Sequence, residues 1–403
     1  MRSWIDPFSL PCEPADDAIF GAVMTAHGSG VASWLMRKHA PDVGQASEGL
    51  VEFVRSWIDA PGAWQTAWDI SFGRAHLALK ESKLDPVEAA IRMGIHIAAS
   101  GHVGAWQAWT PPTVIQFQDR VLEGVTLVAV DNDVSGRCVI RFRLSDGIDI
   151  ELRRSSGSDS WAGEGGHRLI SIGRNRAIRL LPKRSLPAGE REGEVFQDCQ
   201  PVSEITGEAA ESFEAGMTVL ERNTPQYVPW VERVLCGIVV CPREAEFRLV
   251  SGSWEDVPGL VHMSSPHNGI DIAEILVHEA AHQYFYMLQR VGPVDDSTDN
   301  QLYWSPPIRK NRPLSRILMA YHALANVQLL FEAVRSNEAN DKWDIEYVRV
   351  NEPDLQAAIR ALDQPLRGNP ALTKLGRGLY DLLAERMAEL MEMTVPRALA
   401  SGS

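Results

Sequence analysis

The sequence predicts an α+β protein that is mostly helical and keeps its strands in a segregated antiparallel region. Apolar residues recur at helical spacing through residues 14–110 and through much of residues 251–403. Between them, short β-branched segments alternate with turn residues instead of with helices, which favours α+β over a parallel sheet. A His-Glu-Ala-Ala-His motif at residues 278–282 further predicts a metal site between a buried helix and the helix that follows.

The length of 403 residues exceeds that of a usual single domain. We expect an N-terminal helical region at 1–112 and a mixed region with antiparallel strands at 113–250, which is the candidate peptide-binding part. A helical, metal-binding catalytic region is expected at 251–403.

The first half of the chain changes from helix to strand at Pro111-Pro112, which is predicted to end the helical pattern. Asp85 and Pro86 are typical of a helix start. The predicted helices before this point include 18–39, 49–58 and 85–100, and the predicted strands after it are 125–130, 138–144 and 148–152.

The second half returns to helix after a polar connector. The predicted elements are a helix at 206–223, strands at 234–240, 247–250 and 259–263, a buried helix at 272–288, a stiff loop at 306–313, and helices at 315–335, 353–362 and 372–393.

Charge and composition exclude several classes of partner. A net charge of −14 offers no basic surplus for a nucleic-acid backbone. No stretch approaches the roughly 20 apolar residues that span a bilayer, and no apolar signal segment opens the chain. The five cysteines are scattered and odd in number, so no disulfide framework is expected. We therefore predict a cytoplasmic protein without nucleic-acid or membrane partners.

The motif lies in the apolar helix predicted at 272–288. Residues four apart lie on the same helix face, so His278 and His282 can reach one metal ion. Two histidines and Glu279 in a buried helix would be costly without partners. A pair of core histidines bonded to backbone is the alternative, and a metal is the better interpretation.

The ends of this helix are also marked in the sequence. Asp271 followed by Glu274 resembles a capping box at the start, and Gly292-Pro293 is typical of a helix end.

A third ligand must come from elsewhere in the chain. His322 lies on an apolar stripe of the helix predicted at 315–335, where it could also be a core residue without a metal. Packing of this helix against the motif helix favours His322 as the ligand. Glu332 is the rival, because zinc peptidases of one kind take a carboxylate from a later helix.

The proline-rich segment at 306–313 carries two arginines. Arg309 and Arg312 would be held on a stiff loop between the two ligand helices. A planar guanidinium can bind a small carboxylate through two hydrogen bonds. The alternative is that both are exposed loop cations.

A family resemblance follows from these residues. The run at 259–288, with Glu274 and the motif at 278–283, resembles the core of the αKG-HExxH-type peptide β-hydroxylases. The segment at 304–313 and the helix that carries His322 are similar to the second half of that family.

The resemblance covers roughly residues 250–335 and is weak over the N-terminal helices. It implies an Fe(II) centre, 2-oxoglutarate and O2. The implied reaction is hydroxylation of the β-carbon of a residue in a ribosomally synthesised precursor peptide, which would be the partner.

The resemblance also implies roles for individual residues. His278 and His282 would be iron ligands, with His322 as the third, and either Arg309 or Arg312 would bind 2-oxoglutarate. Such sites leave open positions for cosubstrate and O2.

Glu279 has no obvious role in an oxygenase, where it could orient a ligand or a water molecule. In a zinc metallopeptidase, the first alternative, Glu279 would activate zinc-bound water. A second alternative is a non-catalytic peptide-binding accessory protein with a structural metal.

Overall fold

The computed structural model describes residues 4–12, 17–60, 68–81, 85–158, 160–175, 177–187, 200–243 and 250–393. These residues fall into two compact units, each built from separate segments of the chain. Unit 1 comprises Met1–Asp17, Ala215–Val231 and Asn268–Ser403, and unit 2 comprises Ala18–Glu214 and Glu232–His267. This grouping does not test the predicted regions 1–112, 113–250 and 251–403, which remain a prediction.

The fold is α+β, as the sequence predicts. In unit 2 an antiparallel sheet, sheet A, has the strand order β1-β2-β3-β4-β5, with β6 also paired to β3. Its strands are β1 (Ser47–Glu48), β2 (Gly104–Phe117), β3 (Arg120–Asn132), β4 (Cys138–Leu144), β5 (Asp149–Arg154) and β6 (His167–Arg168).

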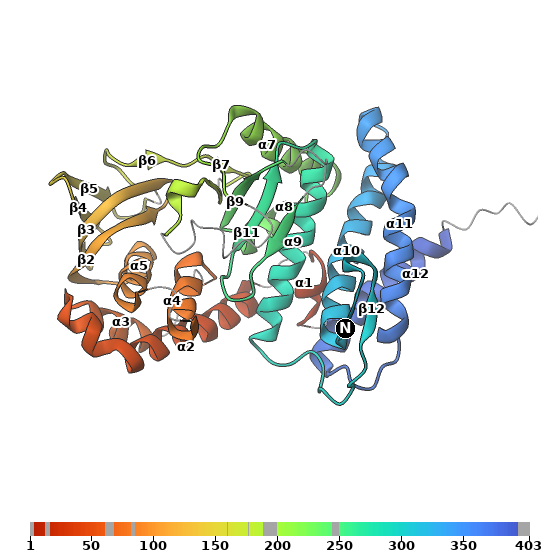
Figure 1. Cartoon of the computed structure of the whole chain (residues 1–403), viewed down its shortest axis with the longest axis horizontal. Helices are drawn as coiled ribbons and strands as arrows, with labels where there is room; N and C mark the ends of the chain where they lie inside the picture. Colours follow the sequence, from red (N-terminus) through yellow and green to blue (C-terminus); the bar gives the residue numbers. More distant parts are fainter. Residues whose placement is uncertain are drawn as a thin grey trace, which may run out of the picture. The chain divides into compact units, whose positions relative to one another are not determined.

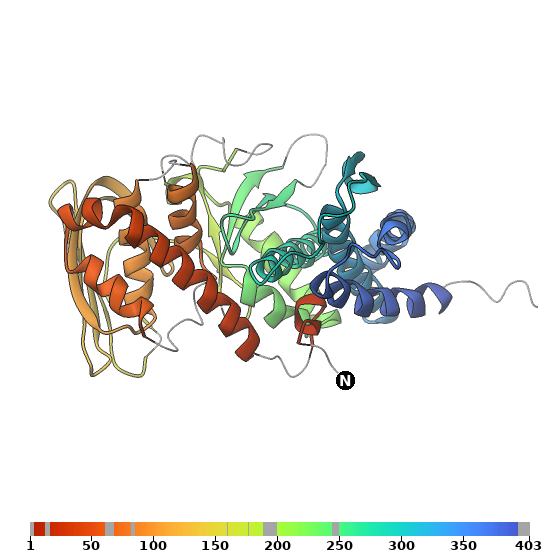
Figure 2. The same cartoon turned by 90° about the horizontal axis from the view of Figure 1, so that it is seen from below.

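Helices cover one face of sheet A. The helices of this part of unit 2 are α2 (Asp17–Gln45), α3 (Leu50–Ile58), α4 (Ile70–Glu81) and α5 (Pro86–Ala99). The α3 and α5 helices pack against β2 (Figure 1 and Figure 2). The Asp85 side chain accepts a hydrogen bond of 2.8 Å from the Val87 N–H, so it caps α5 as its place before Pro86 suggests.

The prediction that the helical pattern continues to residue 110 is wrong, because β2 begins at Gly104. Pro111 and Pro112 do not end an element either; they lie inside β2. The pairing of β2 with β3 shifts register between Trp109 and Thr113. An irregular strand tolerates proline there, since the ladder hydrogen bonds that proline cannot donate are interrupted.

A second sheet in unit 2, sheet B, has the order β10-β11-β9-β8-β7. The prediction of antiparallel strands is wrong for part of it, because β9 pairs in parallel with both β8 and β11. The predicted strand at 247–250 lies almost wholly outside the described residues. The strands are β7 (Ser171–Ile172), β8 (Ile178–Leu181), β9 (Gly237–Pro242), β10 (Ser251–Ser253) and β11 (Leu260–Ser265), with a 3-10 turn η1 (Lys183–Ser185) after β8.

Apolar side chains of α4, of both sheets and of the segments that adjoin the strands share one core in unit 2. They are Ile70, Leu77, Val114, Val121, Leu169, Leu181, Leu186, Val239, Val257 and Leu260. Cys241 of β9 is disulfide-bonded, which the scattered cysteines do not predict because spacing along the chain does not report which thiols meet in space.

Unit 1 is built around one central helix, α10 (Leu314–Ser336), which packs against α9 (Gly269–Gln289), α11 (Lys342–Leu366) and α12 (Lys374–Met393) (Figure 1). By length and composition α10 could cross a membrane, contrary to the expectation that no segment could. However, 78% of its most apolar stretch is buried inside the structure, as is usual for a core helix. The other helices among the described residues are α1 (Asp6–Ser9), α7 (Gly207–Asn223) and α8 (Tyr227–Val234).

The segment predicted as a stiff loop is a hairpin. Strand β12 (Tyr303–Ser305) pairs with β13 (Lys310–Arg312), and a 3-10 turn, η2 (Pro306–Ile308), connects them. The helix predicted at 353–362 begins at Lys342 instead. This helix is α11, and both Pro353 and Pro365 lie inside it. Pro353 is therefore not the start of a helix, as the predicted range assumed.

Candidate metal and cosubstrate site

A stripe of polar side chains runs along one face of helix α9. It consists of Glu274, His278, His282 and Tyr286, each four residues after the last. The rings of His278 and His282 have centroids 4.6 Å apart and planes at 81°. The ring of Tyr286 follows at 6.4 Å from that of His282. The predicted histidine pair is therefore formed by the helix itself.

Glu274 has a different partner from the one predicted. A cap at Asp271 would start the helix at Ile272, but α9 begins about one turn earlier, at Gly269. Its N-cap residue, Asn268, makes no capping hydrogen bond with its side chain. The capping-box prediction is thus wrong. Glu274 instead accepts a hydrogen bond of 2.7 Å from the Tyr347 hydroxyl of α11.

Burial raises the pKa of Glu274 from 4.5 to about 7. The Tyr347 hydrogen bond opposes this shift, and the nearby negative charge of Asp271 adds to it. The carboxyl group of Glu274 therefore changes charge near neutral pH, and it lies one helical turn before His278.

Both motif histidines are held neutral. Burial lowers the pKa of His278, against a smaller opposing effect from the charge of Glu279. Burial, followed by the charge of His278, lowers the pKa of His282 well below 6.5. Among the described residues, the Nδ1 atom of His282 is buried without a hydrogen-bond partner. Neutral imidazoles with available lone pairs are the form that binds metals.

His322 is fully buried in α10 and has a defined tautomer. Its Nε2–H donates a hydrogen bond of 2.9 Å to the Ser9 carbonyl. Burial lowers the pKa of His322 to about 4, although the carbonyls of Ser9, Phe8 and Ala281 act in the opposite direction. The ring is therefore neutral, and the lone pair resides on Nδ1. Within the described part of the chain, that Nδ1 is buried and unpartnered.

These donors fit a metal ion in their chemistry, but the arrangement is not a complete ligand set. The positive charge of a protonated His322 would lower the pKa of His282, so the two rings lie within electrostatic range. Across the described ranges, however, no group of three His, Cys, Asp or Glu side chains is placed to hold a metal ion. The pair is brought together, and the third ligand is not.

The rival ligand Glu332 is engaged on its own helix. It forms an ion pair with Arg335 and accepts a hydrogen bond of 3.0 Å from the Ser336 hydroxyl. Glu332 is therefore occupied by partners near the end of its own helix.

Glu279 is buried, with 1% of its surface exposed. Its charge raises the pKa of His278, so its carboxylate lies within electrostatic range of that ring. This placement suits a group that acts on the histidines or on a molecule bound beside them.

The two predicted arginines differ sharply in position. Arg309 is exposed and adopts a left-handed backbone with φ of 51°. Arg312 is half-buried, and burial followed by the charge of Arg316 lowers its pKa. The charges of Arg316 and Arg312 also lower the pKa of His282. Arg312 therefore lies within electrostatic range of His282, whereas Arg309 is an exposed cation of the hairpin.

Arg316, Tyr286 and Glu274 complete the surroundings, and the sequence analysis assigned none of them to the site. The four-residue spacing that identifies the histidine pair extends to Glu274 and Tyr286 and could have found them. Arg316 also lies four residues after Arg312, but this spacing is not helical. Arg312 ends strand β13, Pro313 follows it, and Arg316 belongs to helix α10.

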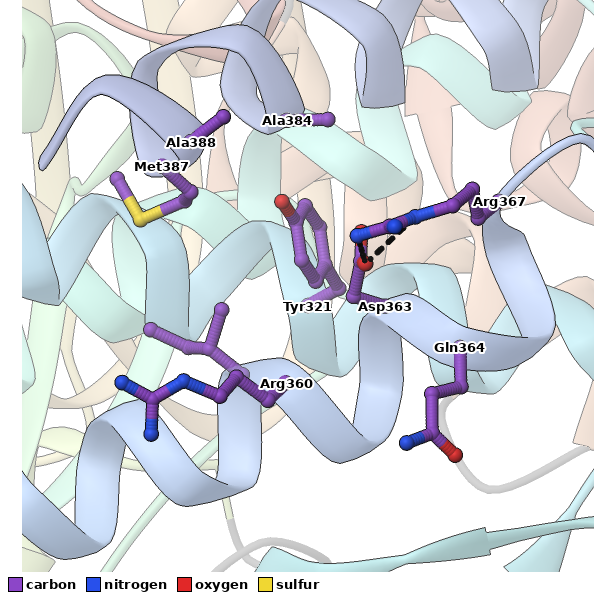
Figure 3. A pocket seen from close by; sticks show the side chains of 9 residues that line it. Tyr321, Arg360, Asp363, Gln364, Arg367, Ala384, Met387 and Ala388 are labelled. Atoms are coloured by element: carbon purple, nitrogen blue, oxygen red, sulfur yellow. Dashed lines mark hydrogen bonds and ion pairs between the residues drawn. The ribbon is translucent and has the colours of Figure 1, made fainter. Parts of the chain in front are cut away.

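A separate cavity of about 430 Å³ lies between α10, α11 and α12 (Figure 3). Tyr321 points into it beneath Ala384 and Ala388, and Arg367 and Asp363 are paired at one side. It contains none of the predicted site residues. Tyr321 and His322 are neighbours in sequence and therefore project from different sides of α10.

Comparison with known proteins does not supply a family. No protein-family model matches the chain, and no curated protein matches it significantly.

Proposed function

We propose that this protein is an Fe(II)- and 2-oxoglutarate-dependent oxygenase that hydroxylates the β-carbon of a residue in a ribosomally synthesised precursor peptide. One observation carries the proposal: the imidazoles of His278 and His282 are half-buried and neutral, and the charges of Arg316 and Arg312 reach His282. A cation site next to an anion site is the combination that a metal with a dicarboxylate cosubstrate requires. The sequence resemblance to peptide β-hydroxylases supports the same reaction.

In this proposal His278 and His282 are iron ligands, and the Nδ1 lone pair of His322 is the third donor. The Nε2–H bond to Ser9 fixes the His322 ring so that this lone pair stays available. Bound iron and 2-oxoglutarate would supply the oxidation of a peptide C–H bond by O2.

Arg312 would bind the carboxylate of 2-oxoglutarate that lies away from the metal, and Arg316 would add positive charge. The guanidinium of Arg312 forms no ion pair or side-chain hydrogen bond with any described residue, so its N–H donors are available to a ligand. Glu279 would orient His278 or a water molecule from its buried position.

Glu279 also keeps a zinc metallopeptidase as the second candidate. Its carboxylate acts electrostatically on His278, as a base for zinc-bound water would. That function gives the two arginines no role. The third candidate is a non-catalytic peptide-binding protein in which the same residues hold a structural metal.

The test uses the full chain, reconstituted with Fe(II) without oxygen and then exposed to air with 2-oxoglutarate. An oxygenase forms succinate, and a precursor peptide encoded beside this protein gains the mass of one oxygen atom. A peptidase shortens the peptide with zinc and loses that activity in Glu279→Gln. A tightly bound metal with neither reaction would leave only the structural role.

A further inference from the structure

Unit 2 contains a cavity of about 860 Å³ at the point where sheets A and B approach. Its wall carries charged side chains from separate elements: Asp69, His96, Asp119, Arg120, Arg168 and Arg179. Leu169, Ile170 and Trp161 add apolar surface. All of these residues belong to unit 2, so the cavity is independent of the proposed metal site.

The cavity is cationic in an acidic protein. Three arginines and two aspartates line it, which leaves one positive charge in excess before His96 is counted. The whole chain carries −14. A local excess of the opposite sign focuses anions into a cleft.

Backbone carbonyls fix two of the arginines in place. Arg120 is buried and donates hydrogen bonds of 2.9 Å to the carbonyls of Gly163 and Gly165. Arg179 donates a bond of 3.0 Å to the Cys236 carbonyl. A carbonyl orients a guanidinium without neutralising its charge, and each of these arginines also lies near one carboxylate, Arg120 at 3.8 Å from Asp119 and Arg179 at 3.6 Å from Asp69.

The carboxylates are shared among several cations and do not cancel them. Asp69 lies 3.6 Å from Arg179 and 3.4 Å from His96, and it accepts a bond of 2.8 Å from the Ser71 N–H. Asp119 lies 3.7 Å from Arg168, whose side chain is 74% exposed. Arg168 is therefore the cation best placed to reach a ligand from the cavity mouth.

We propose that this cavity binds a small organic anion through a phosphate or carboxylate group held by Arg168 with Arg120 and Arg179. A volume of about 860 Å³ is that of a small-molecule site and far exceeds one inorganic ion. A long polyanion is disfavoured, because the net charge of −14 would repel the rest of it. The apolar wall accounts for the carbon skeleton of the ligand.

Titration calorimetry on the full chain tests this with three ring compounds: phenyl phosphate, benzoate and benzyl alcohol. The two anions should bind, and the uncharged alcohol should not. The tighter of the two anions identifies the preferred group. Added salt should weaken binding, since the contact is ionic.

The matched variants are Arg168→Gln in the cavity and Arg141→Gln in β4. Arg141 is also an exposed, ion-paired arginine of sheet A, but it does not line the cavity. Arg168→Gln should weaken binding of the anions by about tenfold, the loss of one charge-assisted contact. Arg141→Gln should leave it unchanged.

Two results would overturn the proposal. One is that neither anion binds the wild-type protein at concentrations up to about 10 mM, because a dissociation constant above this value would mean no specific site. The other is an equal loss in both variants, which would mean non-specific attraction to the surface. Neither result bears on the proposed metal site, which shares no residue with this cavity and is tested by the metal content of the protein.

Discussion

The histidine stripe of α9 and the arginine cavity of unit 2 hold their polar groups in opposite ways. In the stripe, burial removes the charge of His278 and His282 and leaves lone pairs available. In the cavity, backbone carbonyls and the carboxylates of Asp119 and Asp69 hold the guanidinium groups of Arg120 and Arg179 in place. Neutral donors suit a cation and fixed cations suit an anion, so the way a polar group is held indicates what it can bind.

The comparison is sharpest at Glu274, a carboxyl group on the histidine stripe that burial also pushes towards neutrality. Its pKa of about 7 in the folded chain exceeds the ordinary 4.5. Between these values the folded state binds the extra proton, so the free energy of unfolding falls as pH rises from about 4.5 to 7. The total change should be about 3 kcal/mol, at about 1.4 kcal/mol per pKa unit.

Denaturant unfolding near pH 5 and near pH 8 measures this effect, with Glu274→Gln as the variant. The variant should lose this part of the pH dependence and gain stability over wild type at the higher pH. The exposed Glu338→Gln should behave like wild type. An unchanged pH dependence in Glu274→Gln would mean that the carboxyl group is ionised in the folded protein.

A second prediction separates the two hairpin arginines. Arg312→Gln should raise the 2-oxoglutarate concentration needed for half-maximal turnover about 30-fold, the loss of about 2 kcal/mol for a buried charge pair. Arg309→Gln should change it less than about twofold, because an exposed rim cation contributes little. Equal effects would remove Arg312 from the site.

A third prediction compares two neighbours on α10 that bond to the same carbonyl. Asn326 Nδ2 and His322 Nε2 both donate to Ser9 at 2.9 Å, and Asn326 Oδ1 also accepts a bond of 2.7 Å from the Tyr227 hydroxyl. His322→Leu should therefore cost about 1 kcal/mol, since Ser9 keeps one donor. Asn326→Leu should cost about 2 kcal/mol or more, because it removes the donor to Ser9 and the nearer acceptor of the buried Tyr227 hydroxyl, which keeps only the Asn326 carbonyl at 3.4 Å.

Thermal unfolding of both variants decides this, and the metal content of His322→Leu decides the third ligand. Loss of iron with nearly unchanged stability would support His322 as a ligand. Full iron content would leave His322 a core residue that only packs against α9.

The local parts of this architecture could be predicted from the sequence. The helices predicted at 272–288 and 315–335 match α9 and α10 closely, because helical periodicity and the histidine spacing are properties of neighbouring residues. The same spacing gave the pair His278 and His282, which the helix alone brings together.

Features that depend on distant pairing could not be predicted. The hairpin of β12 and β13 and the parallel partners of β9 arise from contacts between segments, and no local pattern specifies them. The arginine cavity is the clearest case, since Arg120, Arg168 and Arg179 come from three different strands. Asp271 favours a cap by its local chemistry, but α9 begins at Gly269 and Asp271 lies inside its first turn.

The central claim is that His278 and His282 hold one metal ion, and metal analysis of the purified chain after anaerobic loading with Fe(II) tests it most directly. The wild-type protein should retain about one iron per chain, and His282→Ala should lose affinity by about 100-fold or more, beyond the effect of losing a residue that only orients a ligand. Glu332→Gln, on the exposed end of α10, should retain the wild-type amount. Equal iron in wild type and His282→Ala, or none in either, would contradict the account.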